Sequence, residues 1–201
     1  MPPRVANLAS VATVPNVLSL FRVVAAPVLL ALAWAGREHA FIALYAANLV
    51  SDCADGFLAR RLHKESVLGA RLDSYGDLAM VVVVPLGVLK LWPDIVVREA
   101  AFIAAGLLSY FVPTAVGVIK YGRPTSYHTW GAKLSAVLVG GSLLLLFLGV
   151  SPWPFRVCVS VAVLEGVEEI VMTLLLREWH ANVPTSLHAW RLRNMERGEN
   201  S

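Results

Sequence analysis

The chain has 201 residues, of which 57% are hydrophobic and only 15% are charged, and its mean hydropathy is +0.65. This composition excludes an ordinary soluble domain, whose apolar residues would alternate with polar ones at helical or strand spacing. The net charge of +3 does not require a nucleic-acid partner, because an uneven distribution of basic residues around a bilayer explains it. We therefore expect an integral membrane protein.

Six apolar runs are long enough to cross about 30 Å of hydrocarbon as helices. Pro85 and Pro113 lie inside two of them, where neighbouring helices tolerate a kink. The connections are short, and no linker or repeat indicates a second domain, so we predict a single all-α membrane domain over residues 1–201. No cleavable signal peptide is expected, because the first run is long enough to remain as a helix. The predicted spans are 14–35, 39–62, 66–92, 95–119, 131–149 and 154–176.

The basic residues indicate the orientation of these spans. If the N-terminus is cytoplasmic, twelve Lys and Arg residues fall on the cytoplasmic side and four on the other. This imbalance favours both termini inside the cell. Cys53 and Cys158 both fall within predicted spans, which gives no reason to expect a disulfide framework. The four outer residues are Arg37, Lys90, Arg98 and Arg156.

Four aspartates interrupt the apolar pattern where the second run ends and the third begins. Each costs about 2.5–3.5 kcal/mol at the centre of a membrane helix, so they must face something polar. Asp52 and Asp55 are three positions apart, and Asp73 and Asp77 are four apart, which places each pair on one helical face. The short connection predicts antiparallel neighbours, so the two acidic faces should meet near the cytoplasmic surface in an all-oxygen pocket.

A pocket of carboxylates without His or Cys suits hard cations, so we expect Mg2+ or Mn2+. Two such ions, about 3.5–4 Å apart, can hold both the attacking and the leaving oxygen of a displacement at phosphorus. Gly56, Ala59 and Gly69 each lie one helical turn from an acid and leave space for a ligand. Arg60 follows at the mouth of the pocket, where its guanidinium can hold a phosphate through two hydrogen bonds.

These residues form the pattern D-x2-D-G-x2-A-R-x8-G-x3-D-x3-D over residues 52–77. The pattern resembles the signature of the CDP-alcohol phosphatidyltransferases at all eight specified positions. Six predicted spans, with the acids on the second and third, are also similar to the layout of that family. Pro15, Asn16 and Arg22 resemble the start of the first helix in phosphatidylglycerophosphate synthases.

The resemblance implies a role for each matching residue. Asp77 would contact metal and act as the general base that deprotonates the acceptor hydroxyl, whose oxygen then attacks the β-phosphorus of a CDP-lipid and releases CMP. The other metal ligands would be Asp52, Asp55 and Asp73. The CDP site would be lined by Gly56, Ala59, Arg60, Ser66 and Gly69, with Asn16 and Ser19 from the first helix on a looser alignment. Ser66, Asn16 and Ser19 could equally cap or hydrogen-bond within their helices.

The acceptor alcohol is less specified, because the signature binds the part of the donor that family members share. Basic residues lie beside the loop between the fourth and fifth spans and after the last span. They could bind an acceptor phosphate or simply anchor the chain at the membrane. These residues are Lys120, Arg123, His128, Lys133, Arg191 and Arg193, of which Lys133, Arg123 and Arg191 are the main candidates. Residues 120–123, KYGR, do not match the KARAE-like sequence of inositol-phosphate-using members. Glycerol 3-phosphate is therefore the leading acceptor, ahead of serine, an amino alcohol or inositol phosphate.

Three alternatives remain open. The aspartates could pair with Arg60, Arg61 and Arg71 in an interfacial hairpin without chemistry. They could instead form the ion site of a divalent-cation transporter, although a guanidinium at the mouth would hinder a cation path. Glu165, Glu168 and Glu169 in the sixth run could complete an acceptor pocket, pair with Arg22, or support helix packing. The family resemblance also implies CDP-diacylglycerol as the donor, membrane lipids as partners, and a homodimer. The small size of the chain and its short loops suggest a bacterial cytoplasmic membrane, and the basic residues predict that the active site faces the cytoplasm.

Overall fold

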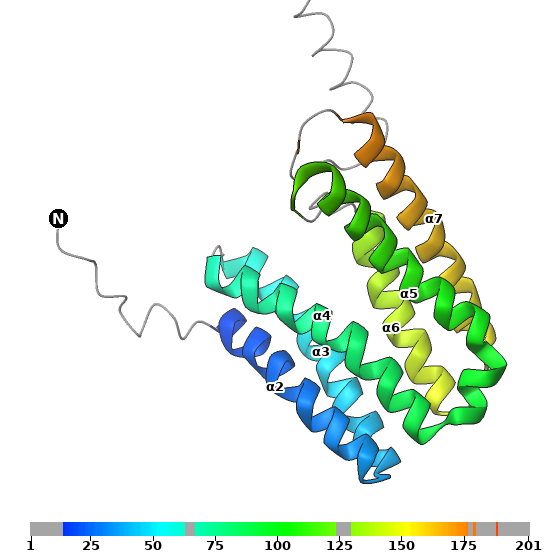
Figure 1. Cartoon of the computed structure of the whole chain (residues 1–201). Coiled ribbons are helices and arrows are strands. Elements are labelled where there is room, and N and C mark those ends of the chain that lie inside the picture. The colour runs from blue at the N-terminus through cyan, green and yellow to red at the C-terminus, as the bar shows by residue number, and fades with distance from the viewer. Residues whose placement is uncertain (1–13, 63–66, 124–129, 177–178, 180–187, 189–201) are drawn as a thin grey trace, which may run out of the picture. The chain divides into compact units, whose positions relative to one another are not determined.

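The computed structural model describes residues 14–62, 67–123, 130–176, 179 and 188. Within these ranges, the side chains of residues 14–17, 55–62, 67–74, 130 and 132–133 lie outside the description. Every regular element in the described part of the chain is an α-helix (Figure 1). The helices are α2 Val14–Trp34, α3 Glu38–Leu62, α4 Val67–Leu91, α5 Pro93–Tyr121, α6 Trp130–Phe147 and α7 Trp153–Leu175.

The helix bounds confirm the predicted all-α architecture, because each lies within two residues of the predicted run. Glycine in the left-handed conformation ends α2 at Gly36, where φ is +66°, and the same occurs after α6 at Gly149, where φ is +70°. At the end of α2, the Arg37 N–H donates to the Leu32 carbonyl oxygen at 2.9 Å and closes the last turn of the helix. Breaks in the apolar pattern at glycines therefore predicted these helix ends.

Of the described helices, α5 alone combines the length, the hydropathy and the low charge that a membrane span requires. Only 11% of its most apolar segment is buried, whereas the core helix of a soluble protein is mostly buried. Leu18–Trp34 and Leu134–Phe147 are shorter apolar segments. That all six helices cross a membrane stays a prediction.

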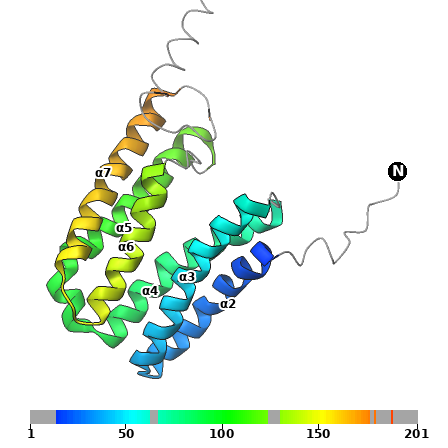
Figure 2. The ribbon, with the colours of Figure 1, turned by 180° about the vertical axis from the view of Figure 1, so that it is seen from behind.

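The chain divides into two compact units, residues 1–98 and 99–201. In the first unit, α2 packs against both α3 and α4, and views from opposite sides show these three helices running alongside one another (Figures 1 and 2). The buried face of α2 is a stripe at helical spacing: Ser19, Arg22, Ala26, Leu29 and Ala33. Large apolar side chains such as Val24 and Val28 instead point outward.

Phe41 lies at the centre of the packing at the opposite end of α3 from the aspartates. Its side chain is fully buried, and a Cβ atom built on Gly87 of α4 would lie 2.5 Å from its ring. The ring also meets Trp92 edge to face, with centroids 5.9 Å apart. Gly87 therefore lets α4 pack directly onto the ring of Phe41.

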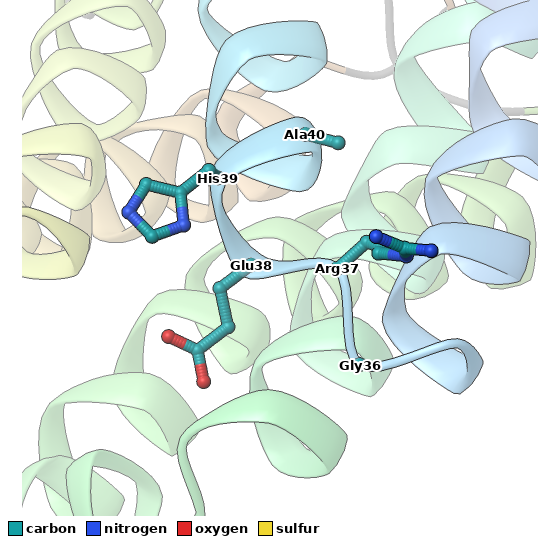
Figure 3. Close-up of a pocket in the computed structure, with 5 residues that line it drawn as sticks. All are labelled: Gly36, Arg37, Glu38, His39 and Ala40. Carbon is teal, nitrogen blue, oxygen red and sulfur yellow. The ribbon is translucent and has the colours of Figure 1, made fainter.

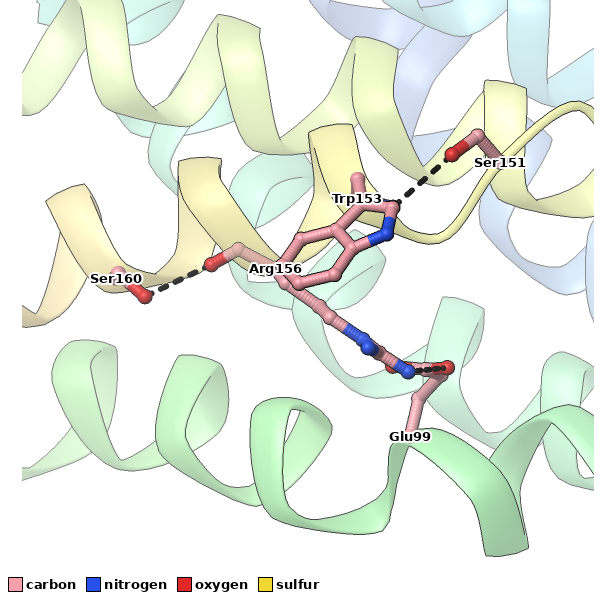
Figure 4. Close-up of polar contacts among 5 residues, drawn as sticks. All are labelled: Glu99, Ser151, Trp153, Arg156 and Ser160. Atoms are coloured by element: carbon pink, nitrogen blue, oxygen red, sulfur yellow. Dashed lines mark hydrogen bonds and ion pairs between the residues drawn. The ribbon is translucent and has the colours of Figure 1, made fainter.

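In the second unit, α6 packs against α7, and α7 also lies close to α5. A Cβ atom on Gly166 of α7 would lie 2.8 Å from the backbone oxygen of Ser109 in α5, so only glycine permits this approach. Glu99 of α5 is fully buried, and Arg156 of α7 donates to its two carboxylate oxygens at 2.8 and 2.9 Å (Figure 4). Such a bidentate pair offsets the cost of burying the Glu99 charge.

Candidate functional site

Asp52 of α3 and Asp77 of α4 meet at a single guanidinium. Arg22 of α2 donates from Nη1 to Asp52 Oδ1 at 2.8 Å, and from Nη2 to Asp77 Oδ1. One side chain from the first helix thus joins one acid from each side of the connection between α3 and α4. This arrangement agrees with the expectation that the two acidic faces meet.

The three side chains of this cluster differ in their exposure. The Arg22 side chain is 2% exposed, whereas those of Asp52 and Asp77 are 41% and 49% exposed. The guanidinium therefore lies inside the first unit, and the two carboxylates open to the outside. An arginine buried in this way would be costly without acidic partners, and the two aspartates supply them.

The rest of the signature continues along the same two helices. On α3, Asp55, Gly56 and Ala59 follow Asp52 at three, four and seven positions, which places all four on one helical face. On α4, Gly69 and Asp73 precede Asp77 at intervals of four and share its face. The pocket predicted for these residues stays a prediction, because the surroundings of Asp55, Gly56, Ala59, Arg60, Gly69 and Asp73 lie outside the description.

The other predicted site residues are distributed as follows. Ser19 is buried on α2, one turn before Arg22. Arg123 follows α5, and its guanidinium carbon lies 3.9 Å from the centre of the Trp179 ring, a cation–π contact that leaves its role toward an acceptor untested. The predictions for Asn16, Ser66, Lys133 and Arg191 concern side chains outside the described residues.

Sequence reasoning missed two buried polar side chains on α3, Asn48 one turn before Asp52 and Ser51 directly before it. Asn48 is 4% exposed and Ser51 is 7% exposed. Neither Asn48 Oδ1 nor Ser51 Oγ has a hydrogen-bond partner in the part of the chain that the structure describes. The spacing of Asn48, Asp52 and Asp55 at helical intervals inside an apolar run was the available signal. Buried polar atoms usually have a partner, so these two sites suit water or a polar ligand.

The donor chemistry of the cluster fits a hard divalent ion. Among the described residues no group of three His, Cys, Asp or Glu side chains could hold a metal, since only two of the four signature aspartates are included. Asp52 and Asp77 supply carboxylate oxygens only, which suit Mg2+ or Mn2+. Each carboxylate offers about four lone-pair sites, so a bond from Arg22 to Oδ1 does not exhaust it.

Lys120 has a structural position that the sequence interpretation did not anticipate. Its Nζ donates to the carbonyl oxygens of Thr173 and Leu176, both at 2.7 Å, at the end of α7. The Tyr121 hydroxyl lies within hydrogen-bond distance of the same two oxygens, at 2.9 and 3.0 Å, and can donate its one proton to either. A lysine here satisfies carbonyls that lack helical partners and complements the negative end of the helix dipole. Lys120 therefore caps α7.

We expect Lys120→Met to lower the stability of the protein by about 1–2 kcal/mol, because charged hydrogen bonds to three carbonyls of α7 are lost. Thermal unfolding in detergent measures this change. Lys90→Met is the matched control, since Lys90 is an exposed lysine in the last turn of α4. Unchanged stability with a raised KM for the acceptor alcohol would instead show that Lys120 binds the acceptor.

Glu165 of α7 lies against the start of α6. A Cβ atom on Gly131 would overlap its carboxylate group, with the Glu165 Cδ atom only 2.5 Å away. Glu165 therefore takes part in packing within the second unit, one of the three roles considered for it. Contact of Glu165, Glu168 or Glu169 with an acceptor stays a prediction.

A hollow at the turn between α2 and α3 is lined by Gly36, Arg37, Glu38, His39 and Ala40 (Figure 3). It lies at the start of α3, fourteen residues before Asp52 and about 21 Å away along the helix axis. No residue of the acidic signature lines it. The candidate site is therefore the aspartate cluster and not this hollow.

A family model described as CDP-alcohol phosphatidyltransferase matches residues 12–177, which include all six described helices and the whole aspartate signature. The chain belongs to this family. No solved structure matches it.

Relatives within the family carry two kinds of name. The chain is 40% identical over 75 residues to an Arabidopsis thaliana protein named CDP-diacylglycerol–glycerol-3-phosphate 3-phosphatidyltransferase 2, covering 35% of this chain and 32% of the relative. It is 28% identical over 131 residues to a protein of Pseudomonas fluorescens with the corresponding name, covering 64% and 60%. It is also 33% identical over 104 residues to a putative cardiolipin synthase of Mycobacterium bovis, covering 49% and 50%. The chain thus spans from about a third to three fifths of the length of these relatives.

Proposed function

We propose that the chain transfers a phosphatidyl group from CDP-diacylglycerol to the hydroxyl of glycerol 3-phosphate and releases CMP. The observation that carries this proposal is the meeting of Asp52 and Asp77 at Arg22 in a member of the CDP-alcohol phosphatidyltransferase family. Two relatives are named for glycerol 3-phosphate, which supports that acceptor over serine or inositol phosphate. The match to a putative cardiolipin synthase keeps a larger glycerol-bearing lipid as a second candidate acceptor.

Asp77 acts as the base in this proposal. It accepts the proton of the acceptor hydroxyl as that oxygen attacks the β-phosphorus of the donor. The bond from the β-phosphorus to the oxygen it shares with the CMP phosphate breaks, and CMP leaves with the electron pair. Arg60, one turn after the acids on α3, holds the pyrophosphate by two hydrogen bonds.

Asp52, Asp55, Asp73 and Asp77 would hold two ions of Mg2+ or Mn2+, which neutralise the charge that develops on the phosphate oxygens. Gly56, Ala59, Ser66 and Gly69, with Asn16 and Ser19 of α2, line the space for CDP. Lys133, Arg123 and Arg191 bind the phosphate of the acceptor. A divalent-cation transporter would need the same acids but has no use for Arg60.

All six helices cross the membrane in this proposal. The buried stripe of α2 contains alanines, while larger apolar side chains such as Val24 and Val28 are about half exposed, at 54% and 44%. Small residues between helices and large apolar ones outside are typical of helices packed in lipid. The excess of basic residues on one side supports a cytoplasmic location for both termini and the aspartates, in a membrane that this proposal takes as bacterial.

The two compact units form one catalytic domain in this proposal. The family match supports this, because it runs across the boundary at residues 98 and 99 without a break. A homodimer is part of the same proposal and rests on the family resemblance alone. Crosslinking of the purified protein in lipid nanodiscs reports the number of subunits.

The experiment that tests the proposal measures CMP release by the purified protein. CDP-diacylglycerol and Mg2+ or Mn2+ are supplied with glycerol 3-phosphate, inositol phosphate, inositol, serine, phosphatidylglycerol or water. We expect release that depends on glycerol 3-phosphate and stops when EDTA removes the metal. Release that depends on another alcohol would correct the acceptor. Folded protein that releases no CMP with any acceptor would contradict the proposal.

A further inference from the structure

Arg22 belongs to neither the signature pattern nor the residues assigned to metal, base or nucleotide, yet it joins two of the proposed metal ligands. Its two terminal nitrogens donate to different carboxylates, Nη1 to Asp52 and Nη2 to Asp77. These acids are 25 residues apart on different helices, and Arg22 comes from a third. A planar guanidinium fixes the directions of both hydrogen bonds, so it sets the position of each carboxylate relative to the other.

The protein provides a fitted space for Arg22. Gly76 of α4 is buried, and a Cβ atom there would lie 3.2 Å from Arg22 Cβ, 3.7 Å from Nε and 3.8 Å from Cζ. The arginine therefore runs along the backbone of α4 at the residue before Asp77. Because the closest atom is the first carbon of the arginine side chain, rotation of its far end cannot relieve the crowding that a methyl group would cause.

The burial of Arg22 shows which side of the carboxylates it occupies. The Arg22 side chain is 2% exposed, whereas the two acids that its guanidinium contacts are 41% and 49% exposed. It therefore approaches the acids from inside the unit and leaves their outer side open. A buried hydrogen-bond donor that orients ligating carboxylates is the usual partner of a metal site, and its loss typically weakens metal affinity about 10–100-fold.

We infer that Arg22 is a positioning residue, which holds Asp52 and Asp77 from beneath in the geometry that a divalent ion requires. This inference rests on the proposed function, because it takes the two aspartates as metal ligands. Arg22 touches neither substrate in this role. It also supplies one positive charge among four aspartates and so reduces their mutual repulsion before metal binds.

Arg22→Lys separates geometry from charge. Lysine keeps the positive charge on a flexible chain, but one ammonium group replaces the fork that reaches two carboxylates at fixed directions. Arg22→Lys therefore keeps the positive charge beside the aspartates, so a change in metal affinity reports the lost geometry and not a lost charge. Gly76→Ala provides a second variant, because it crowds Arg22 while leaving Arg22, Asp52 and Asp77 chemically unchanged.

The experiment titrates the full-length protein in detergent or nanodiscs with Mn2+ and follows the free ion by electron paramagnetic resonance. We expect Arg22→Lys to raise the Kd for Mn2+ about 10–100-fold, and Gly76→Ala to raise it by a smaller factor. Gly141→Ala on α6 is the matched control, since a Cβ atom there meets nothing within 4 Å and its Kd should be unchanged. Elution volume and helical circular dichroism confirm that each variant is folded.

The possible outcomes separate this inference from the proposed function. Wild-type protein that binds Mn2+ and releases CMP, with Arg22→Lys binding Mn2+ equally well or more tightly, would overturn the inference and leave the function standing. If Arg22→Lys does not fold, Gly76→Ala alone decides, and an unchanged Kd in that variant overturns the inference. Wild-type protein that neither binds Mn2+ nor releases CMP would contradict the function itself.

Discussion

Asp77→Asn is expected to reduce the rate of CMP release by about 10²–10⁴-fold, the contribution typical of a general base. Asparagine has nearly the same shape and keeps an oxygen that can accept the hydrogen bond from Arg22. It cannot take up the proton of the acceptor hydroxyl, and its amide is a weaker ligand for a hard cation. The fold should therefore persist while the reaction is lost.

Asp94→Asn is the matched control for this prediction. Asp94 is an exposed aspartate in the first turn of α5, outside the signature. Its replacement should leave CMP release unchanged, and thermal unfolding in detergent should show all three proteins folded. If Asp77→Asn retained the wild-type rate, Asp77 would be neither the base nor an essential metal ligand.

Phe41→Ala is expected to destabilise the protein by about 3–5 kcal/mol, the usual cost of removing a buried aromatic ring and leaving a cavity. The Phe41 side chain is fully buried, packs directly against Gly87 and meets Trp92 edge to face. Its loss removes the contact that holds the start of α3 against α4. Thermal or denaturant unfolding in detergent measures the change.

Trp34→Ala provides the comparison, because Trp34 is a larger aromatic residue in the same unit but is 60% exposed. Its removal should change stability far less than that of Phe41, since most of its surface does not contact packed side chains. Equal losses from the two substitutions would contradict the distinction between the inner and outer faces of these helices. That distinction underlies the proposal that large outward side chains face lipid.

The helices were predictable from sequence because long apolar runs end at residues with a clear local effect. Gly36 and Gly149 adopt positive φ and end α2 and the last turn of α6, and Pro93 begins α5 directly after α4. The acidic faces were predictable for a similar reason, since intervals of three and four residues are local properties of a helix. The single domain and the membrane crossing of the six helices depend on longer-range relations and stay predictions.

The role of Arg22 was not predictable, because a single arginine in an apolar run does not reveal its partners. Asp52 and Asp77 lie 30 and 55 positions further along the chain, and only the packing of α2 against α3 and α4 brings them to one guanidinium. Lys120 shows the same limit. Its position beside a basic loop suggested phosphate binding or membrane anchoring, whereas its partners are carbonyl oxygens of residues more than 50 positions further along the chain.

The most direct test of the account identifies the lipid product by mass spectrometry. The purified protein in nanodiscs receives CDP-diacylglycerol, Mn2+ and glycerol 3-phosphate carrying carbon-13. The account predicts labelled phosphatidylglycerophosphate in amounts equal to the CMP released, and about 10²–10⁴-fold slower formation of it by Asp77→Asn. CMP released with only unlabelled phosphatidic acid, or CDP-diacylglycerol left intact by folded protein with bound metal, would contradict transfer to this alcohol.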